Sequence, residues 1–302
     1  MQDFYPSRIA PKPEWIARKD PVIHAADRSA SPVGVEAIDA FERDGFLVLE
    51  DVLSGEEVSA LRREADALRS GRRELDPKSL ITERSSGDIR SVFAIHQQSE
   101  VLHRLATDDR LTGLARHILG DEIYVHQSRL NYKPAFRGKE FYWHSDFETW
   151  HVEDGMPRMR AVSMSVMLDD NHAQAGPTMF VPGSHRSFIA CVGETPENHY
   201  LTSLKKQEYG VPDEDSLDRL VRETGIVAPA PRAGSVVIFD CNTMHGSNGN
   251  ITPYARANAF FVFNAWSNRL VDPFGGRDPR PEFIAHRRVD APLGSRDRRK
   301  AA

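Results

Sequence analysis

Residues 141–151 read Phe-Tyr-Trp-His-Ser-Asp-Phe-Glu-Thr-Trp-His, an aromatic-rich stretch around which the rest of the chain can be organised. His144 and Asp146 stand two apart, so in an extended strand their side chains project from the same face. A second histidine, His245, lies far downstream in Asn-Thr-Met-His-Gly. Two histidines and one carboxylate are the ligand set of non-haem Fe(II) sites, although a His-x-Asp tripeptide also arises by chance. The sequence thus predicts a metal site at His144, Asp146 and His245, if the remaining residues support it.

The composition is that of an ordinary globular protein, with 302 residues, 40% hydrophobic and 27% charged. The formal net charge of -5 argues against a nucleic-acid partner, which needs a basic surface. No apolar run reaches the roughly 18 residues of a membrane span, and residues 1–20 lack the apolar core of a signal peptide. Two cysteines, Cys191 and Cys241, are too few for a disulfide framework. We therefore expect a cytoplasmic protein that contacts no membrane.

Helical patterns come first along the chain and strand patterns follow. An irregular N-terminal arm (residues 1–34) precedes expected helices at 35–44, 54–71, 100–106 and 109–119, with a strand at 46–49 and a loop at 72–90. Ser54 and Glu57 fit a capping box for the second helix. Strands are expected at 91–95, 123–133, 159–168, 176–185, 235–240 and 254–265, with an irregular tail at 272–302. This order predicts one domain, residues 1–302, of α+β class but mainly β, around an antiparallel jelly roll flanked by helices.

Two of the expected strands carry unusual polar faces. In residues 123–133 one face combines Gln127, Arg129, Asn131 and Lys133, which fits either a solvent face or a binding face inside a barrel. In residues 159–168 the face with Ser163 and Ser165 is small and polar, as a wall facing a ligand would be. Residues 194–223 are polar and form an insertion that could cover the barrel mouth.

Arg256 follows His245 by eleven residues, on the next expected strand. An iron enzyme that uses 2-oxoglutarate needs a fixed cation for the distal carboxylate, and the arginine fork can hold one bidentately. A lone arginine on a strand is more often a solvated charge. Four other histidines are expected to be structural or surface groups, namely His126, His151, His172 and His185. Asp240 lies near His245 in the sequence, and the two could be mistaken for an acid–base pair. The chain has neither a Gly-x-Ser-x-Gly nucleophile elbow nor a glycine-rich phosphate loop.

The order His144-x-Asp146, the segment Gly-Pro-Thr-Met-Phe-Val-Pro-Gly-Ser-His at 176–185, then His245 and Arg256, resembles the phytanoyl-CoA dioxygenase family. Residues 141–160 are similar to the signature of the ectoine-hydroxylating branch of that family, and the resemblance runs from about residue 41 to 285. It implies a double-stranded β-helix core of cupin-like type, with Fe(II) as cofactor and 2-oxoglutarate and O2 as co-substrates. The implied reaction hydroxylates ectoine to 5-hydroxyectoine, a compatible solute of osmotic stress, and releases succinate and CO2.

The resemblance also implies a role for individual residues. His144, Asp146 and His245 would hold iron, and no catalytic group beyond the metal centre is required. The co-substrate would contact residues with polar or aromatic side chains, namely Arg256, Lys133, Asn131, Phe141, Ser165 and Ser247. Ectoine would contact a second set, namely Gln127, Thr149, Trp150, Asn258 and Phe260. Trp150 suits the delocalised amidinium of ectoine, because a cation–π contact contributes about 0.5–2 kcal/mol. Arg129 is expected to play a supporting or ion-pairing role.

Two other functions fit the same residues. One is an oxygenase of this family that acts on another small amino-acid-like substrate. The other is a jelly-roll binding protein without catalysis, which the intact metal and arginine positions argue against. A homodimer is compatible with the sequence, which does not determine the oligomeric state.

Overall fold

Antiparallel β-sheets dominate the computed structural model, which describes residues 2–82, 87–203 and 209–294. The major sheet has seven strands in the order β2-β10-β7-β12-β5-β4-β3, and a three-stranded sheet has the order β6-β11-β8. A short third sheet pairs β1 with β9. The strands are β1 (Glu14–Ala17), β2 (Phe46–Leu49), β3 (Leu80–Thr82), β4 (Ile89–Phe93), β5 (Ile123–Lys133), β6 (Phe141–His144), β7 (Ala161–Met167), β8 (Thr178–Phe180), β9 (Ser187–Ala190), β10 (Val236–Asp240), β11 (His245–Ser247) and β12 (Arg256–Ala265).

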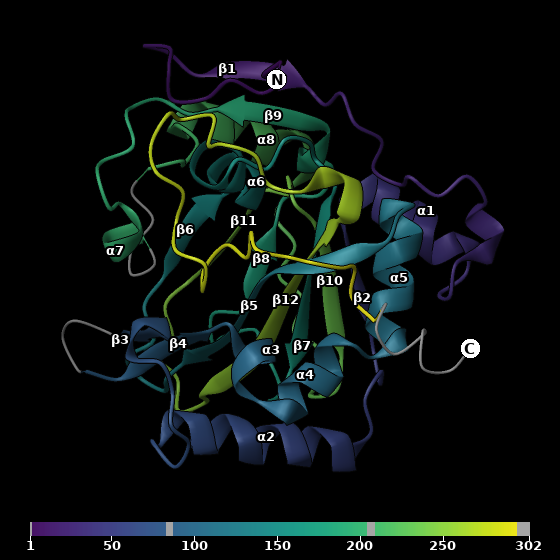
Figure 1. Ribbon diagram of the computed structural model, residues 1–302, viewed down its shortest axis with the longest axis vertical. Coiled ribbons are helices and arrows are strands. Elements are labelled where there is room, and N and C mark those ends of the chain that lie inside the picture. The colour runs from purple at the N-terminus through teal and green to yellow at the C-terminus, as the bar shows by residue number, and fades with distance from the viewer. Residues whose placement is uncertain (1, 83–86, 204–208, 295–302) are drawn as a thin grey trace.

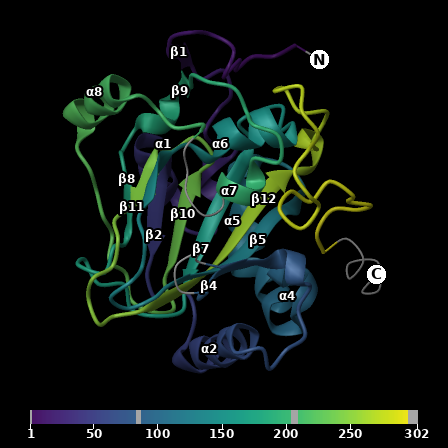
Figure 2. The ribbon, with the colours of Figure 1, turned by 90° about the vertical axis from the view of Figure 1, so that its left-hand side faces the viewer.

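Helices accompany these sheets, and those in the first 120 residues bury side chains against the major sheet. The helices are α1 (Val35–Asp44), α2 (Gly55–Arg69), α3 (Ile95–Gln98), α4 (Glu100–Ala106), α5 (Asp109–Leu119), α6 (Asp146–Thr149), α7 (Tyr200–Ser203) and α8 (Glu214–Thr224). Figures 1 and 2 place α2 and α4 toward one end of the strands, with β1, β9 and α8 at the opposite end. Within the described ranges, no helix is both long and apolar enough to cross a bilayer.

Local sequence explains several element ends. The Ser54 side chain accepts from the backbone of Glu57, and the Glu57 carboxylate accepts from the backbone of Ser54 at 2.7 Å, so the predicted capping box is confirmed. Gly45 ends α1 with φ of 82°, in the left-handed region that favours glycine. A Cβ atom at Gly45 would also lie 2.4 Å from the His185 ring, so this turn requires glycine.

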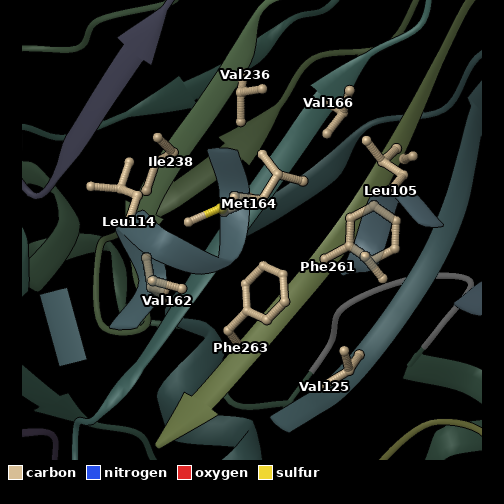
Figure 3. Close-up of a cluster of buried hydrophobic side chains, with 14 of the residues drawn as sticks. Leu105, Leu114, Val125, Val162, Met164, Val166, Val236, Ile238, Phe261 and Phe263 are labelled. Carbon is tan, nitrogen blue, oxygen red and sulfur yellow. The ribbon is translucent and has the colours of Figure 1, made fainter. Parts of the chain in front are cut away.

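The main hydrophobic core lies between the helices and the outer face of the major sheet. Figure 3 shows alternate residues of β7, β10 and β12 meeting side chains of the helices. Val162, Met164 and Val166 point into this core, so Ser163 and Ser165 take the opposite face, toward the interior between the two sheets. A smaller cluster in that interior joins Phe180 of β8 to Phe239 and Phe260 of the major sheet. The two facing sheets form the predicted jelly roll.

The structure corrects several expected elements. Residues 141–151 are not one strand: β6 ends at His144, and Asp146 is the first residue of α6, followed by the π-helical turn η3 (Trp150–Asp154). The expected loop at 72–90 contains β3 and the start of β4, because hydrogen bonding to the sheet edge overrides its charged composition. The stretch 176–185 is a strand only at Thr178–Phe180, since Pro182 and Gly183 break it.

The chain ends are more ordered than their composition predicts. The N-terminal arm contains β1, which pairs with β9, and a short 3-10 helix at Arg28–Ala30. Residues 272–294 of the tail lack regular structure, but they are anchored by the buried residues Arg280, Ile284 and Ala285. Within residues 194–223, part of the expected lid (204–208) lies outside the described residues. The described part packs against the end of the molecule that carries β9.

Candidate active site

Three buried side chains form the only described cluster of histidine, cysteine and acidic ligands close enough to hold one metal ion. His144, Asp146 and His245 each offer a ligand atom, and these atoms all lie within 4.8 Å of one another. Cross-strand pairing explains the approach, because His144 of β6 faces His245 of β11 in antiparallel register. Ser145 keeps an extended backbone, so Asp146 projects beside His144 although it begins a helix. The structure therefore brings together the three predicted metal ligands.

Backbone carbonyls orient both imidazoles. The Nδ1 atom of His144 lies 2.8 Å from the carbonyl of Tyr142, and Nδ1 of His245 lies 2.9 Å from the carbonyl of Thr243. Because a carbonyl only accepts, each Nδ1 carries a proton, which leaves Nε2 as the nitrogen that can bind a metal. Those Nε2 atoms lie 3.6 and 4.0 Å from the Asp146 carboxylate, farther than a good hydrogen bond. This donor set and spacing fit a divalent metal ion between the three side chains.

The protonation states also fit a metal. Burial lowers the pKa of His245 to about 4, so its imidazole is neutral at pH 7. Burial alone would raise the pKa of Asp146, but His245 and His144 outweigh that effect and hold the pKa below its usual value. The Ser163 hydroxyl donates to Oδ2 of Asp146 at 3.3 Å, which gives the polar face of β7 a role. The sequence indicated that face without assigning Ser163 to the site.

A cavity leads from the two histidines along β5 and β12. Its lining includes five cationic side chains and no carboxylate among the described residues; the cations are Arg90, Arg129, Lys133, Lys139 and Arg256. Burial, then Arg256 and Arg90, lowers the pKa of Lys133 to about 6, and burial lowers the pKa of Arg256 to about 10. Lys133 and Arg256 are both buried, and buried positive charge is unfavourable unless it is paired, so an anionic ligand beside these two side chains would be strongly stabilised.

Arg256 lines the cavity, and neighbouring polar groups fix its guanidinium. Its Nη2 donates to the carbonyl of Gly176 at 2.7 Å, while its Nε is buried without a partner. With its amide oxygen turned toward Arg256, Asn258 accepts from Nη1 at 3.0 Å and donates to the carbonyl of Ala257 at 2.9 Å. Arg256 lies opposite Lys133 in the β12–β5 register, so the two cations share one end of the strand pair.

Most of the predicted co-substrate residues line this cavity. They are Arg256, Lys133, Asn131, Phe141 and Ser247. Ser165 does not line it, but it lies opposite Phe260 in the β12–β7 register and its buried hydroxyl has no partner. Lys133 Nζ donates to Ser247 Oγ at 2.9 Å, which joins two predicted residues from separate strands.

The predicted substrate residues are more dispersed. Phe260 lines the cavity, whereas Gln127, Thr149, Trp150 and Asn258 do not. Trp150 is 3% exposed and its ring meets His126 edge-on at 5.2 Å. Gln127 donates to the carbonyl of Ile284 at 2.9 Å, which ties it to the C-terminal tail.

Arg129 is one of several cavity residues to which the sequence assigned no direct contact; others include Arg90, Phe93, Lys139 and Thr178. The Arg129 guanidinium donates to Gln127 Oε1 at 2.8 Å and lies 5.1 Å from the centre of the Phe260 ring. Its Nε is buried without a partner, and burial lowers its pKa. The sequence feature that could have placed Arg129 in the site is the polar face of residues 123–133, which Arg129 shares with Gln127 and Lys133.

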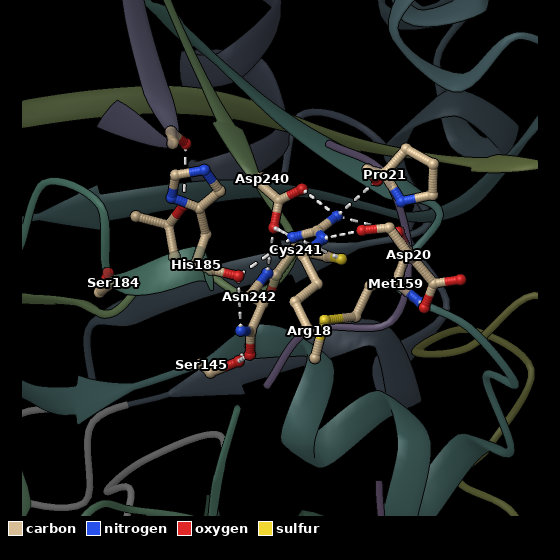
Figure 4. Close-up of polar contacts among 12 residues, drawn as sticks. Arg18, Asp20, Pro21, Ser145, Met159, Ser184, His185, Asp240, Cys241 and Asn242 are labelled. Carbon is tan, nitrogen blue, oxygen red and sulfur yellow. Dashed lines mark hydrogen bonds and ion pairs between the residues drawn. The ribbon is translucent and has the colours of Figure 1, made fainter. Parts of the chain in front are cut away.

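Structural contacts account for the other histidines and for Asp240. His151 stacks on Phe274 at 4.0 Å, and His172 stacks on Tyr254 at 4.1 Å. His126 contacts Asp154, and His185 contacts the carbonyl of Glu42. Asp240 accepts two hydrogen bonds from Arg18, at 2.7 and 2.9 Å, so it is not the acid–base partner of His245 (Figure 4).

A two-histidine, one-carboxylate site beside a cation-lined cavity, inside a jelly roll, defines the class of Fe(II)- and 2-oxo-acid-dependent oxygenases. The sequence profile of the phytanoyl-CoA dioxygenase (PhyH) family matches residues 41–258, and the chain belongs to this family.

Relatives and solved structures agree over nearly the whole chain. An ectoine dioxygenase of Sphingopyxis alaskensis is 58% identical over 293 residues, which cover 97% of this chain and 96% of the relative. One from Halomonas elongata is 52% identical, covering 94% of this chain and 86% of the relative. The crystal structure of S. alaskensis EctD with 2-oxoglutarate and 5-hydroxyectoine has a TM-score of 0.89 at 53% identity, with 97% of each chain covered. The predicted family and fold class are confirmed.

Proposed function

We propose that this chain is an Fe(II)- and 2-oxoglutarate-dependent dioxygenase that hydroxylates ectoine to 5-hydroxyectoine and releases succinate and CO2. The observation that carries the proposal is the cavity that joins His144 and His245 to Lys133 and Arg256, with cations and no carboxylate in its described lining. A 2-oxo dicarboxylic acid fits this arrangement, because one end can chelate a metal while the other pairs with an arginine. The similarity to ectoine dioxygenases along almost the entire chain supports the substrate.

His144, Asp146 and His245 would hold the iron, which supplies the chemistry that couples O2 and 2-oxoglutarate to hydroxylation of a ring CH2 group. A related EctD structure contains bound Fe, at 52% identity and a TM-score of 0.87. The protein contributes two imidazoles that the carbonyls of Tyr142 and Thr243 orient, and a carboxylate that accepts from Ser163.

Arg256 would receive the distal carboxylate of 2-oxoglutarate. Gly176 and Asn258 hold the guanidinium, whose buried Nε has no partner among the described residues. Further contacts would come from the cavity wall and from the free Ser165 hydroxyl; the wall residues are Asn131, Lys133, Phe141 and Ser247. This anchoring would orient the 2-oxo acid toward the iron ligands.

Ectoine would lie on the face of α6 that also carries Asp146. Residues i, i+3 and i+4 share a helix face, which places Thr149 and Trp150 on the same side as Asp146. Gln127 and Phe260 would complete this pocket from the major sheet, with Trp150 against the amidinium. The contact that supports a role for Asn258 is its hydrogen bond to Arg256, so it belongs at the co-substrate end. No side chain is needed as a general acid or base, since the protein only holds the reactants and excludes water.

The remaining features of the proposal concern the molecule as a whole. We place the reaction in one oxygenase domain formed by residues 1–302, in the cytoplasm, with ectoine as a small-molecule partner and without nucleic acid or membrane. A homodimer is compatible with this proposal, and light scattering of the purified protein would determine the assembly.

The test is product analysis after incubation of the purified protein with ectoine, Fe(II), 2-oxoglutarate and O2. We expect 5-hydroxyectoine and succinate in equal amounts. Hydroxylation of another small amino acid or amine in preference to ectoine would identify a different substrate within the same family. Absence of succinate with every substrate, together with no visible charge-transfer band on anaerobic addition of Fe(II) and 2-oxoglutarate, would contradict the enzyme assignment.

A further inference from the structure

Two buried arginines of the N-terminal arm reach the segments that carry the metal ligands. Arg8 and Arg18 have side chains that are only 2% and 5% exposed, and both pair with buried carboxylates. The family profile begins at residue 41, so this arm lies outside the region that the profile matches. The resemblance assigned the arm no role.

Arg8 holds the helix that begins with Asp146. Its Nε and Nη2 donate to the Glu148 carboxylate at 3.0 and 2.7 Å, and its Nη1 donates to Glu153 at 2.8 Å. Glu148 stands two residues after Asp146, about 200° around a helix, so Arg8 holds the face opposite the metal ligand. Glu153 belongs to η3, so Arg8 binds one carboxylate in α6 and one in the turn that follows it.

The surroundings of Arg8 show a closely fitted site. The Ser7 hydroxyl donates to Glu148 at 2.6 Å, and the Thr195 hydroxyl accepts from Arg8 at 2.8 Å. Gly210 closes over the pair, since a Cβ atom there would lie 2.3 Å from the Glu148 carboxylate. Arg8 itself has φ of 59°, an unfavourable backbone conformation for a residue with a side chain.

Arg18 holds the turn that leads to His245. Its guanidinium binds Asp240 bidentately, and Asp240 Oδ1 accepts from the backbone N–H of Asn242 at 2.8 Å. The Asn242 side chain in turn accepts a hydrogen bond of 2.9 Å from the Ser145 hydroxyl (Figure 4). Ser145 stands between His144 and Asp146 in the sequence. One chain of hydrogen bonds thus connects the arm to both strands of the metal site.

We propose that the N-terminal arm positions the iron ligands, with Arg8 fixing the Asp146 helix and Arg18 fixing the turns around His144 and His245. A buried ion pair adds little to stability, because desolvation offsets much of the attraction, whereas its geometry can specify a single arrangement. Both arginines use planar, bidentate contacts, which suit positioning better than a flexible ammonium would. Arg8 and Arg18 are therefore positioning residues that act through Glu148 and Asp240. The inference rests on the proposed iron site but does not depend on ectoine being the substrate.

The test compares Arg8→Lys and Arg18→Lys with Arg28→Lys, a matched control at an exposed ion pair of the same arm. Lysine keeps the charge and removes the fork. Loss of a direct partner of a metal ligand typically weakens metal binding about 10–100-fold, and Arg8 and Arg18 act one contact farther away, so the low end of that range applies. We expect an increase of about tenfold in the Fe(II) dissociation constant for Arg8→Lys and Arg18→Lys, with unchanged binding for Arg28→Lys. Wild-type Fe(II) affinity in both buried variants, with only a lower melting temperature, would make the arm a purely structural element.

A second measurement needs no variant and covers the case in which the Lys proteins do not fold. If the arm favours the metal-binding geometry, metal binding must stabilise the arm by the same coupling. Anaerobic Fe(II) should therefore slow amide hydrogen exchange in residues 3–20 of the wild-type protein, while exchange in α2 stays unchanged. Unchanged exchange in the arm on saturation with Fe(II) would overturn the inference. Failure of the ectoine proposal would instead appear as absent hydroxyectoine in the wild-type protein, with Fe(II) binding intact.

Discussion

Replacing Arg256 with alanine should selectively weaken 2-oxoglutarate binding. The guanidinium is buried and held by Gly176 and Asn258, and its Nε has no partner among the described residues. Truncating one partner of a buried charge pair costs about 2–5 kcal/mol. A loss of about 3 kcal/mol corresponds to a roughly 100-fold higher Kd, since each 1.4 kcal/mol is tenfold. Arg256→Lys should recover only part of this, because an ammonium cannot reproduce the planar fork.

The assay is an anaerobic titration with 2-oxoglutarate in the presence of Fe(II), followed by the visible charge-transfer band. Arg269→Lys, an exposed arginine that stacks on Trp266, is the control and should match the wild type. The KM for ectoine should change much less than the KM for 2-oxoglutarate. An unchanged Kd for 2-oxoglutarate in Arg256→Ala would refute this role and transfer the distal carboxylate to another cation such as Lys133.

Further predictions concern the metal, the substrate, the co-substrate and acid stability. His245→Ala should lose iron and turnover while circular dichroism stays native; full turnover would remove this residue from the ligand set. Trp150→Ala should keep the charge-transfer band yet lose most hydroxyectoine, with Trp150→Phe intermediate, and normal product from Trp150→Ala would return this ring to the core. Asn258→Asp should raise the KM for 2-oxoglutarate far more than that for ectoine, because a new carboxylate would compete for the neighbouring guanidinium; the reverse order would make residue 258 a substrate contact. Burial lowers the pKa of His24 to about 4 and of His96 to about 3, against about 6.5 when unfolded. The unfolded chain therefore binds more protons below pH 6.5, and the urea midpoint should fall from pH 7 to pH 5. Replacing both histidines with glutamine should make that fall shallower, and an equally steep fall would contradict the assignment.

Periodicity was the most reliable guide to the fold. The helices 35–44, 100–106 and 109–119 and the strand 123–133 have the predicted bounds. The helices each bury an apolar face, whereas both faces of the strand are buried, one of them polar. Short elements were less predictable. Asp146 starts a helix because the backbone turns after Ser145, and local propensity does not show that turn. The outcome for the side chain is the same, since Asp146 still projects beside His144.

The candidate site was predictable where its residues alternate along a strand. Asn131 and Lys133 line the cavity because they share a face of β5, and Arg129 joins them for the same reason. Contacts between distant segments were not predictable. Arg8 lies 140 residues from Glu148 in the sequence, and Arg18 lies 222 residues from Asp240. No local sequence pattern predicts either ion pair, because the two partners come close only when the chain folds.

The most direct test of the central claim is isotope incorporation from 18O2 during turnover with ectoine. A dioxygenase of this type transfers one oxygen atom of O2 to the hydroxylated product and the other to succinate. We predict that mass spectrometry will find one labelled oxygen in 5-hydroxyectoine and labelled carboxylate in succinate, with no labelled hydroxyl when the label is supplied as water. Hydroxyectoine whose hydroxyl comes from water, or consumption of 2-oxoglutarate without any hydroxylated ectoine, would contradict the account.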